Sequence, residues 1–413
     1  MSNNNIKRIT KGIGIILISL IVISSLGGVS ANWTMFHENI EHTGFIEEAG
    51  DFVSNLWIKD IGSVIKSSPA IKDKILYIAG KNGILKAINM EDGSEKWNQN
   101  FNGTIIASPI IKGNDLFIGT DEYMYSYNIE EEKVNWKFKV SKPIESTATI
   151  NEEILYFGAD NGKVYALNAN DGSKVWEKEI GGKVKSSPAI ANDTLYIGST
   201  NGKIVGLRIS DGSELWNYVT GDAVTSSPAI TDEKVYIGSQ DGTLYSLKGS
   251  DGSIVWKYEL GNKIISSPTL DTRENSLFIG SDNGYITSLD LRDGTLKWEY
   301  KTGGPVQSTP ALYEDKVVVG SNDGTGYILN KYTGNIEMTY NPGTYLFNAP
   351  FSSSSIVYGE SLFFAGEDGY VYSLDSQKLD APTSNFVYYT IAILIILFIV
   401  LIAITITIRR KRR

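Results

Sequence analysis

The sequence predicts an all-β fold, an eight-bladed β-propeller of four-stranded antiparallel blades, followed by one C-terminal transmembrane helix. Three observations predict it: a tryptophan that returns at a nearly constant interval, paired turn motifs within the intervals, and an uncharged apolar segment near the end of the chain. The chain has 413 residues, of which 42% are hydrophobic and 11% aromatic, so it can bury a sizeable core.

The first 31 residues have the layout of a secretory signal peptide. A basic start is followed by an apolar run from Ile13 to Ile23 and by small residues at Val29 and Ala31, which predicts cleavage after Ala31. An uncleaved membrane anchor is the alternative. Residues 32–52 then form a lead-in segment to the repeat region at 53–375.

Seven tryptophans and one methionine mark eight repeats. A proline, or an alanine in one repeat, stands twelve residues after each of them, and both series advance by the same steps of 39 to 42 residues. Periods near forty are typical of propeller blades or helical arrays. The first series is Trp57, Trp97, Trp136, Trp176, Trp216, Trp256, Trp298 and Met338, and the second is Pro69, Pro109, Ala148, Pro188, Pro228, Pro268, Pro310 and Pro350.

Local propensity favours blades over helices. Each repeat contains short β-branched and aromatic runs, such as TLYIG at 194–198 and KIVGL at 203–207, and no long helical pattern. Asn-Gly or Asp-Gly, the strongest short hairpin signal, joins these runs in most repeats. A second turn, Asp-Gly-Ser/Thr, precedes the tryptophan in five of them. We therefore predict four strands per blade: A (SSPAI), B (LYIG), C (KIVGL) and D (ELW).

The eighth repeat ends after its strand C at Tyr370–Leu374, and a surplus strand D lies at the front of the chain around Trp57. We predict that this strand completes the last blade and closes the ring, because the sheet of blade eight would otherwise lack its fourth strand and leave an open edge. The rhythm breaks at Ala311–Leu362, where we expect the A–B connection of blade eight to gain FSSSSIVYGES.

The end of the chain predicts a membrane anchor. A polar linker at 376–385 is followed by an uncharged apolar segment at 386–408, long enough to span a bilayer as a helix. The basic tail at 409–413 predicts a cytoplasmic C-terminus and an extracytoplasmic propeller.

The stretch A-x-N-x-x-D-G-x-x-x-W, at Ala87–Trp97 and Ala166–Trp176, resembles the tryptophan-docking repeat of pyrroloquinoline-quinone (PQQ)-type propellers. The WTMFHENIEHTGF segment (33–45) is similar to the N-terminal segment of secreted members. The resemblance covers about residues 33–375 and implies that each indole packs against a small residue and against a glycine of an adjacent repeat. Glu132, Ile328 and Met338 depart from the motif and predict looser docking around blades two and seven.

The resemblance implies two functions. One is quinone-dependent oxidation, with PQQ and calcium as cofactors; the other is a non-catalytic scaffold like the propeller lipoproteins of bacterial outer-membrane assembly. The enzymes of this family often carry a disulfide between adjacent cysteines and insertions that build the pocket. This chain has no cysteine and its repeats are short, so the scaffold is favoured and no cofactor is expected.

Other chemistry receives little support. Asp-Asn-Gly turns such as Asp160–Gly162 and Asp282–Gly284 are better explained as hairpins than as calcium loops, which need six to eight ligands. His37 and His42 are the two histidines and have no evident third ligand, so no metal site is predicted. The Ser-Ser-Pro motif has no base beside it, and we interpret it as a crowded inner strand rather than a nucleophile. No catalytic residue is predicted.

Charge and topology predict the partners. Both chain ends are basic, so the middle is more acidic than the formal net charge of −9, which argues against nucleic acid as a partner.

Strand direction alternates, so D–A links and B–C turns share one face, and A–B and C–D turns share the other. The chain leaves from the A–B/C–D face, so that face is expected toward the membrane and the D–A/B–C face outward.

A set of varied positions lies on the outward face, three residues before each proline position. We call these positions the inner rim and predict that they bind a protein or surface polymer. They are Lys66, Ile106, Glu145, Lys185, Thr225, Ile265, Gln307 and Phe347. Three sequons are candidate glycosylation sites: Asn32, Asn102 and Asn192.

The sequence therefore predicts a membrane-tethered extracytoplasmic propeller that acts as a binding or assembly scaffold at the cell surface. A PQQ-dependent dehydrogenase is the first alternative, and a surface receptor for sugars or peptides is the second.

Overall fold

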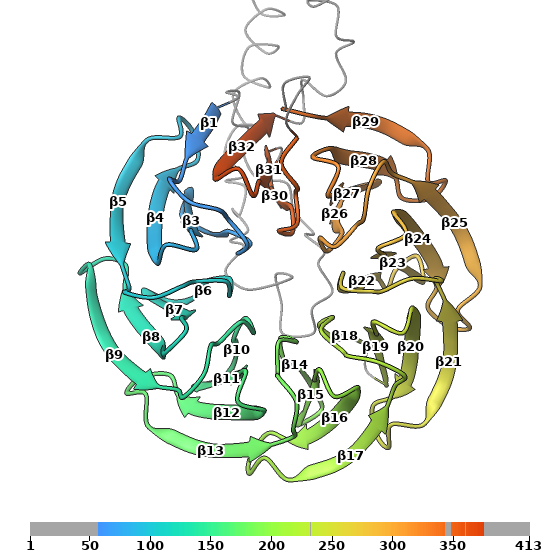
Figure 1. Cartoon of the computed structure of the whole chain (residues 1–413), viewed down its shortest axis with the longest axis horizontal. Coiled ribbons are helices and arrows are strands. Elements are labelled where there is room, and N and C mark those ends of the chain that lie inside the picture. The colour runs from blue at the N-terminus through green and yellow to red at the C-terminus, as the bar shows by residue number, and fades with distance from the viewer. Residues whose placement is uncertain (1–56, 232, 343–347, 360, 376–413) are drawn as a thin grey trace, which may run out of the picture.

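Eight four-stranded antiparallel sheets stand around one central axis, as Figure 1 shows. The computed structural model describes residues 57–231, 233–342, 348–359 and 361–375. The predicted all-β, eight-bladed propeller of four-stranded blades is confirmed in this part of the chain.

Blades one to four follow the chain from strand A at the centre to strand D at the outside. Blade one is β2 (Ala70–Lys72), β3 (Ile75–Ala79), β4 (Ile84–Asn89) and β5 (Glu95–Asn100), and blade two is β6 (Ile110–Lys112), β7 (Asp115–Gly119), β8 (Tyr123–Asn128) and β9 (Lys133–Lys139). Blade three is β10 (Thr149–Asn151), β11 (Ile154–Gly158), β12 (Lys163–Asn168) and β13 (Lys174–Glu179), and blade four is β14 (Ala189–Ala191), β15 (Thr194–Gly198), β16 (Lys203–Arg208) and β17 (Glu214–Val219).

Blades five to seven repeat this order, and blade eight combines both ends of the described chain. Blade five is β18 (Ala229–Ile230), β19 (Lys234–Gly238), β20 (Thr243–Lys248) and β21 (Ile254–Glu259), and blade six is β22 (Thr269–Asp271), β23 (Ser276–Gly280), β24 (Tyr285–Asp290) and β25 (Leu296–Lys301). Blade seven is β26 (Ala311–Tyr313), β27 (Lys316–Gly320), β28 (Gly326–Asn330) and β29 (Ile336–Tyr340), and blade eight is β30 (Ile356–Tyr358), β31 (Ser361–Ala365), β32 (Tyr370–Asp375) and β1 (Trp57–Asp60).

The two turn motifs form as their sequences predict. In blade three the B–C hairpin has Gly162 at φ 82°, a conformation that glycine adopts without a Cβ penalty. In the C–D turn of the same blade, the Asp171 carboxylate accepts hydrogen bonds from the Ser173 hydroxyl at 2.6 Å and the Ser173 amide at 2.9 Å. These bonds hold the pKa of Asp171 below its usual value.

The ring closes through β1, as predicted. β1 pairs antiparallel with β32, with Trp57 opposite Ser373 and Lys59 opposite Val371, so the first described strand lies beside the last in Figure 1. The buried core lies between neighbouring sheets. The closing contact, for example, packs Trp57 and Phe363 of blade eight against Leu76 of blade one.

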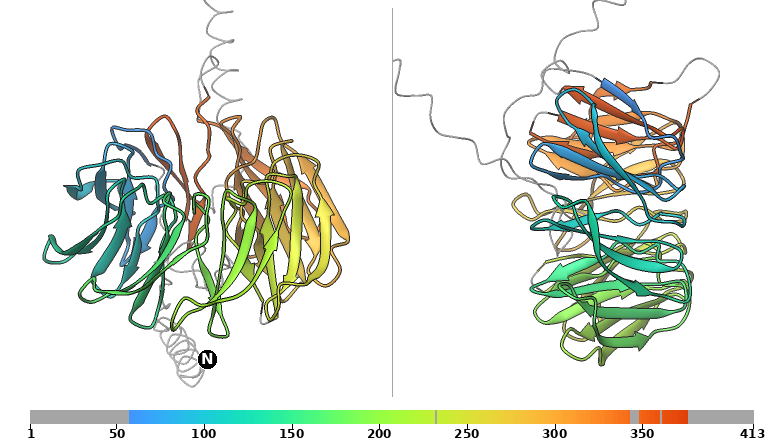
Figure 2. Two further views of the ribbon diagram at one scale, coloured as in Figure 1. Left: turned by 60° about the horizontal axis from the view of Figure 1, so that its bottom comes forward. Right: turned by 90° about the vertical axis from the view of Figure 1, so that its left-hand side faces the viewer.

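The predicted assignment of turns to faces is confirmed. In blade one the Met90 amide of the C–D turn donates to the Lys74 carbonyl of the A–B turn, at 3.0 Å. The Lys81 amide of the B–C turn donates to the Val64 carbonyl of the D–A link, at 2.9 Å. Figure 2 shows the two sets of turns at opposite faces of the disc. β1 starts, and β32 ends, at the A–B/C–D face.

The predicted alignment of blade eight is wrong by five residues. Strand A is β30, and the short turn after Tyr358 joins it to β31, so the extra residues lie in the D–A link and not in the A–B connection. The Ser353 hydroxyl donates to the Ala365 carbonyl at 2.9 Å, as Ser67 does to Ala79 in blade one at 2.8 Å. Pro350 therefore precedes the strand-A position that the spacing assigned to it.

Several predicted segments fall outside the described residues. They are the signal peptide (1–31), the lead-in segment (32–52), the linker (376–385), the span (386–408) and the tail (409–413). Within the part of the chain that the structure describes, no helix is long and apolar enough to cross a membrane.

Candidate binding surface at the inner rim

The inner rim lies in the D–A links, immediately before strand A of each blade. Its described members are all half-buried, and they lie next to the B–C turns of the same or the neighbouring blade. Phe347 lies outside the described residues, and Ser352 occupies the equivalent place in blade eight, directly before Ser353.

Lys66 joins the first and last blades across the closing contact. Its ammonium forms an ion pair with the Glu367 carboxylate and donates to the Ser352 hydroxyl at 3.4 Å. Ser352 in turn donates to Glu367 at 2.7 Å. Three side chains from the two ends of the repeat region therefore form one polar cluster on the rim.

Blades three and four meet at a second polar cluster that contains two ion pairs. Lys185 lies 2.7 Å from Glu145, and Lys183 lies 2.8 Å from Asp160. The bond to Asp160 raises the pKa of Lys183. The Asp160 side chain is only 5% exposed, and its second oxygen, Oδ1, has no hydrogen-bond partner within the described residues.

The opposite side of the rim is uncharged or singly charged. The Gln240 side chain donates to the Thr225 hydroxyl at 3.1 Å, and the Gln307 side chain donates to Asp282 at 2.9 Å. Ile265 leaves an apolar position between them. The rim thus presents two Lys–Glu clusters with Ile106 between them on one side, and amides, a hydroxyl, an isoleucine and the Asp282 carboxylate on the other.

The B–C turns contribute a second set of rim residues that the sequence analysis did not identify. They are the second residues after strand B, and they include Asp160, Gln240, Asp282 and Glu367. A signal was present, because this position varies from repeat to repeat just before the regular Asn-Gly or Asp-Gly turn. Its pairing with the D–A link requires the fold.

The Ser-Ser-Pro hydroxyls form a closed ring of hydrogen bonds around the axis. The second residue of each pair donates its backbone N–H to the side-chain oxygen of its counterpart in the next blade, at 2.8 to 3.4 Å. The members are Ser68, Ser108, Thr147, Ser187, Ser227, Ser267, Thr309 and Ser354. Seven of these hydroxyls are buried and that of Ser354 is half-buried, and their role is structural, in agreement with the predicted crowded inner strand.

The tryptophans dock each blade onto the next. In six of them the indole N–H donates to a backbone carbonyl of the following blade, at 2.7 to 3.2 Å; they are Trp57, Trp136, Trp176, Trp216, Trp256 and Trp298. The ring also covers the turn glycine of that blade. A Cβ on Gly212 would lie 2.7 Å from Cε3 of the Trp176 indole. Each of these tryptophans therefore contacts the following blade through a hydrogen bond and through its ring.

Comparisons with known families agree with this geometry. A family model described as "Beta-alanine-activating enzyme, beta-propeller" matches residues 152–390, more than half of the chain. A second, "Outer membrane protein assembly factor BamB", matches residues 53–183. This chain belongs to the PQQ-like β-propeller family. The small residue that the family motif places opposite the indole is present here as Ala166, which pairs with Trp176.

The relatives of this PQQ-like propeller include outer membrane protein assembly factors. BamB of Escherichia coli (strain K12) is 28% identical over 101 residues, which are 21% of this chain and 26% of that protein. BamB of Legionella pneumophila (strain Paris) is 27% identical over 71 residues, 16% of this chain and 18% of that protein. The chain thus spans about a quarter or less of the length of these relatives.

Solved structures share the fold. BamB from Moraxella catarrhalis has a TM-score of 0.64 at 19% identity and covers 77% of this chain and 100% of its own. The quinohemoprotein alcohol dehydrogenase from Comamonas testosteroni has a TM-score of 0.71 at 12% identity, with 85% and 81% covered. The computationally designed Ika8 protein has a TM-score of 0.70 at 16% identity, with 79% and 100% covered.

The departures from the PQQ-like motif change docking locally. In blade two Glu132 takes φ 50° where the motif has glycine, and Trp97 is the one described tryptophan that lacks the indole hydrogen bond. In blade seven Ile328 pairs with Met338, so apolar contact replaces the indole bond. The predicted looser docking therefore takes the form of lost hydrogen bonds at these two places.

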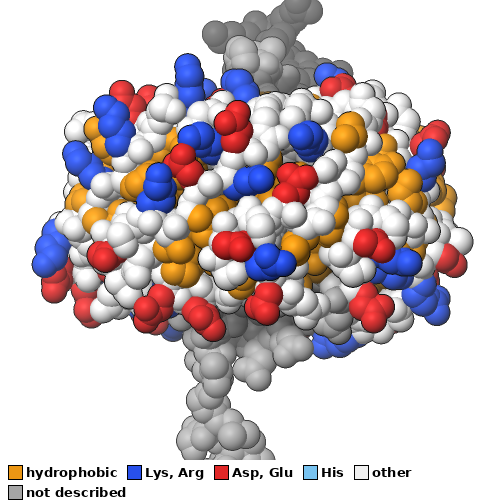
Figure 3. Space-filling model, turned by 90° about the horizontal axis from the view of Figure 1, so that it is seen from below, with side chains coloured by type: hydrophobic (Ala, Val, Ile, Leu, Met, Phe, Trp, Pro, Cys, Tyr) orange, Lys and Arg blue, Asp and Glu red, His pale blue; other side chains and the backbone are white. Residues whose placement is uncertain are grey.

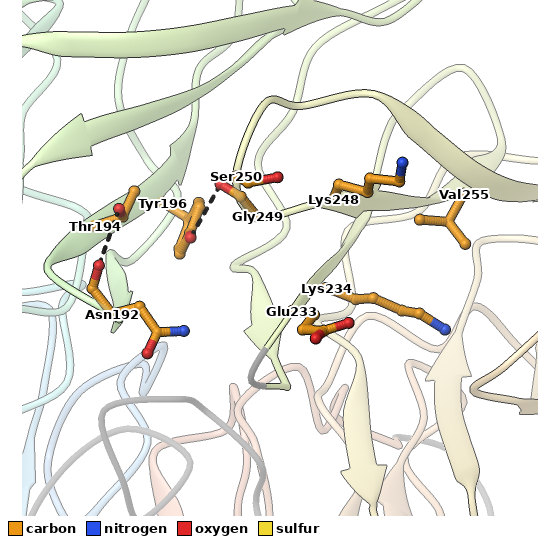
Figure 4. A pocket seen from close by; sticks show the side chains of 9 residues that line it. All are labelled: Asn192, Thr194, Tyr196, Glu233, Lys234, Lys248, Gly249, Ser250 and Val255. Carbon is orange, nitrogen blue, oxygen red and sulfur yellow. Dashed lines mark hydrogen bonds between the residues drawn. The ribbon is translucent and has the colours of Figure 1, made fainter.

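The A–B/C–D face of the propeller contains two hollows beside blade four. Figure 4 shows one of them, a cavity of about 490 Å³ between blades four and five, with Tyr196 donating to the Gly249 carbonyl at 3.2 Å. Burial raises the pKa of Tyr196. Lys234 and Lys248 line the same hollow. The second, of about 530 Å³, lies between blades three and four.

The remaining predicted sites are only partly covered by the structure. Asn102 and Asn192 are exposed, one in a D–A link and the other in an A–B turn, while Asn32, His37 and His42 lie outside the described residues. In the described ranges, no group of three or more histidine, aspartate or glutamate side chains could hold a metal ion.

Proposed function

We propose that this chain is a membrane-tethered, extracytoplasmic β-propeller that acts as a protein-binding or assembly scaffold and needs no cofactor. One observation carries the proposal. The inner rim places different side chains at equivalent positions of a strictly repeated frame, on the face opposite to both ends of the described chain.

The position of β32 supports the orientation. β32 ends at the A–B/C–D face, and the ten residues of the linker at 376–385 reach at most about 35 Å before the predicted span. A tether this short keeps the A–B/C–D face toward the membrane. The inner rim then faces away from the membrane, where a partner can reach it.

The chemistry of the inner rim fits a protein surface. The Lys–Glu clusters and the amides are half-buried and close enough to exchange their internal bonds for bonds to a partner. The similarity to BamB, described as an outer membrane protein assembly factor, supports an assembly role. A receptor for sugars or peptides is the competing function for the same surface.

The test uses charge reversal on the inner rim with a matched charge-swap variant. Lys185→Glu places two carboxylates together, whereas Lys185→Glu combined with Glu145→Lys keeps the ion pair and inverts its direction. A photo-crosslinking residue at Thr225 captures the bound partner in cells, and mass spectrometry identifies it. We expect both variants to lose most of that product, while the swap variant melts at the temperature of the parent chain.

Unchanged partner capture by the swap variant would show that the inner rim does not bind the partner. A crosslinker at Lys257, on the outer wall of blade five, is the position control, and equal capture there would also contradict the proposal. Adding PQQ and calcium to the purified chain, with a redox dye as acceptor, tests the dehydrogenase. Dye reduction with an alcohol or a sugar would replace the scaffold by that alternative.

A further inference from the structure

Strand D of each blade is an edge strand. Each one ends its sheet, so one row of backbone N–H and C=O groups faces outward without a neighbouring strand. Such edges can pair with other chains, and natural proteins protect them with charged side chains, above all with lysine.

Six of the eight D strands carry at least one lysine; they are β1, β5, β9, β13, β21 and β25. The two that carry none are β17, with the sequence ELWNYV, and β29, with the sequence IEMTY. β29 has Glu337 within the strand, whereas the one charge of β17 is at its first residue. β17 is therefore the least protected edge among the described strands.

Two of the exposed residues of β17 are also apolar. Leu215 is 42% exposed and Val219 is 59% exposed, with the exposed Asn217 between them on alternate positions of the strand. Figure 3 looks at the wall that lies at the bottom of Figure 1, where β13 and β17 run, and it shows hydrophobic side chains gathered between charged ones. One of the two hollows reaches this wall at Leu215 and Val175.

The sequence of β17 is complementary to itself in an antiparallel register. With Asn217 opposite Asn217 of a second copy, Leu215 lies opposite Val219 and Glu214 lies opposite Thr220. Apolar side chains then meet on both sides of the centre, and the two amides can bond to each other. Leu215 is itself the bulged residue of β17, and Trp216–Val219 are in regular register with β16.

Six of the other seven D strands do not have this property. In four of them the residue after tryptophan is charged, so the same two-fold pairing places like charges opposite each other; these residues are Lys137, Glu177, Lys257 and Glu299. In β5 the residues that flank the centre are Lys96 and Asn100, and in β29 they are Glu337 and Asn341, so no apolar pair forms.

We propose that two copies of this chain form a dimer by antiparallel pairing of β17 with β17. In Figure 1 β17 runs along the rim of the disc, and its two ends lie at opposite faces, so the two-fold axis of an antiparallel pair is normal to β17 and inclined to the disc axis. The two copies then meet edge to edge through blade four. The inner rim lies at the D–A/B–C face near the centre of the disc and not on its outer edge, so the dimer and the proposed rim function can fail independently.

The chain has no cysteine, which gives a direct test. In Asn217→Cys the two thiols lie opposite each other across the two-fold axis, so mild oxidation of the full chain in detergent should give a disulfide-linked dimer on non-reducing gels. Lys257→Cys, at the equivalent place in β21, is the matched control and should run as an uncrosslinked single chain on the same gel. Equal crosslinking of both variants, or none in Asn217→Cys, would overturn the proposal.

A second measurement does not depend on oxidation. Leu215→Lys with Val219→Lys adds charge to an exposed edge and should shift the full chain from dimer to monomer in sedimentation velocity, with an unchanged circular dichroism spectrum. Val175→Lys, at a side chain that is 49% exposed on β13, should leave the dimer intact. A parent chain that stays monomeric over the whole concentration series would contradict the dimer.

Discussion

At the scale of the residue, the two serines of each repeat make different hydrogen bonds, which the motif alone does not reveal. In blade four the first serine of the pair, Ser186, accepts the Gly198 amide of its own blade at 3.1 Å. The second, Ser187, accepts the Thr147 amide of the preceding blade at 3.0 Å. One hydroxyl therefore fixes strand A within its sheet, and the other joins neighbouring sheets.

Removing one ring hydroxyl should destabilise the propeller. Ser187→Ala leaves the Thr147 amide buried without a partner, so we expect a loss of about 1–3 kcal/mol in the free energy of unfolding, measured in urea. Ser210→Ala, at an exposed residue of the same blade, is the control and should have little effect. Equal stability of both variants would contradict the role of the ring.

Residue chemistry also marks where sequence reasoning stops. The positions of Lys66 and Lys185 on the rim could be read from the repeat, but their partners could not. Glu145 lies one repeat away from Lys185, and Glu367 lies at the far end of the chain from Lys66. Pairs of this kind depend on which blades are neighbours, and the pair with Glu367 exists because the ring closes.

At the scale of the element, the unit of construction is the joint between strand D of one blade and the C–D turn of the next. Gly252 takes φ 70° under the Trp216 indole, and a Cβ there would lie 2.4 Å from Cε3 of that ring. The glycine is needed for both the backbone conformation and the close approach.

A pair of glycine variants should separate these two demands. In Gly252→Ala the new Cβ has to tolerate a positive φ and also clashes with the Trp216 indole. In Gly261→Ala the residue has a positive φ of 82°, but no atom lies within 4 Å of the new Cβ. We expect Gly261→Ala to cost about 1–2 kcal/mol for its backbone alone and Gly252→Ala to cost about 1–3 kcal/mol more. Thermal and urea unfolding measure the difference. An equal loss in the free energy of unfolding in both variants would show that the indole moves away from the new Cβ without cost.

Element boundaries were predictable where turn chemistry and spacing agreed. The B–C and C–D turns form at their Asn-Gly and Asp-Gly motifs, and the seven tryptophans and Met338 align the D strands. Blade eight misled the spacing argument because Pro350 falls at the expected interval by coincidence. The position of its strand A is set by the bond from Ser353 to Ala365, a contact with no short sequence signal.

At the scale of the whole molecule, closure of the ring was predictable from a simple count, since one strand D was surplus at the front and one was missing at the back. The structure pairs β1 with β32 and adds the indole bond from Trp57 to Met90 of blade one, at 2.7 Å. The last sheet and the first joint therefore depend on the same four residues.

Deleting β1 should weaken the whole disc and not only its last blade. A full chain without residues 57–60 loses the outer neighbour of β32 and the buried Trp57, so we expect a lower melting temperature and faster hydrogen exchange at 370–375. Ile58→Lys, at a side chain that is 54% exposed, keeps the strand and is the control. Unchanged protection of the β32 amides from hydrogen exchange after the deletion would show that β1 is not needed to hold the last sheet.

The place of β32 has a mechanical consequence. The last strand is not at the outside of its sheet, because it lies between β31 and β1 and is hydrogen-bonded to both. A force on the C-terminal end of β32 therefore loads two rows of hydrogen bonds in shear. One row joins β32 to β31, and the other joins it to β1, the first described strand. Tension on β32 is therefore shared between the first and the last described strands of the propeller.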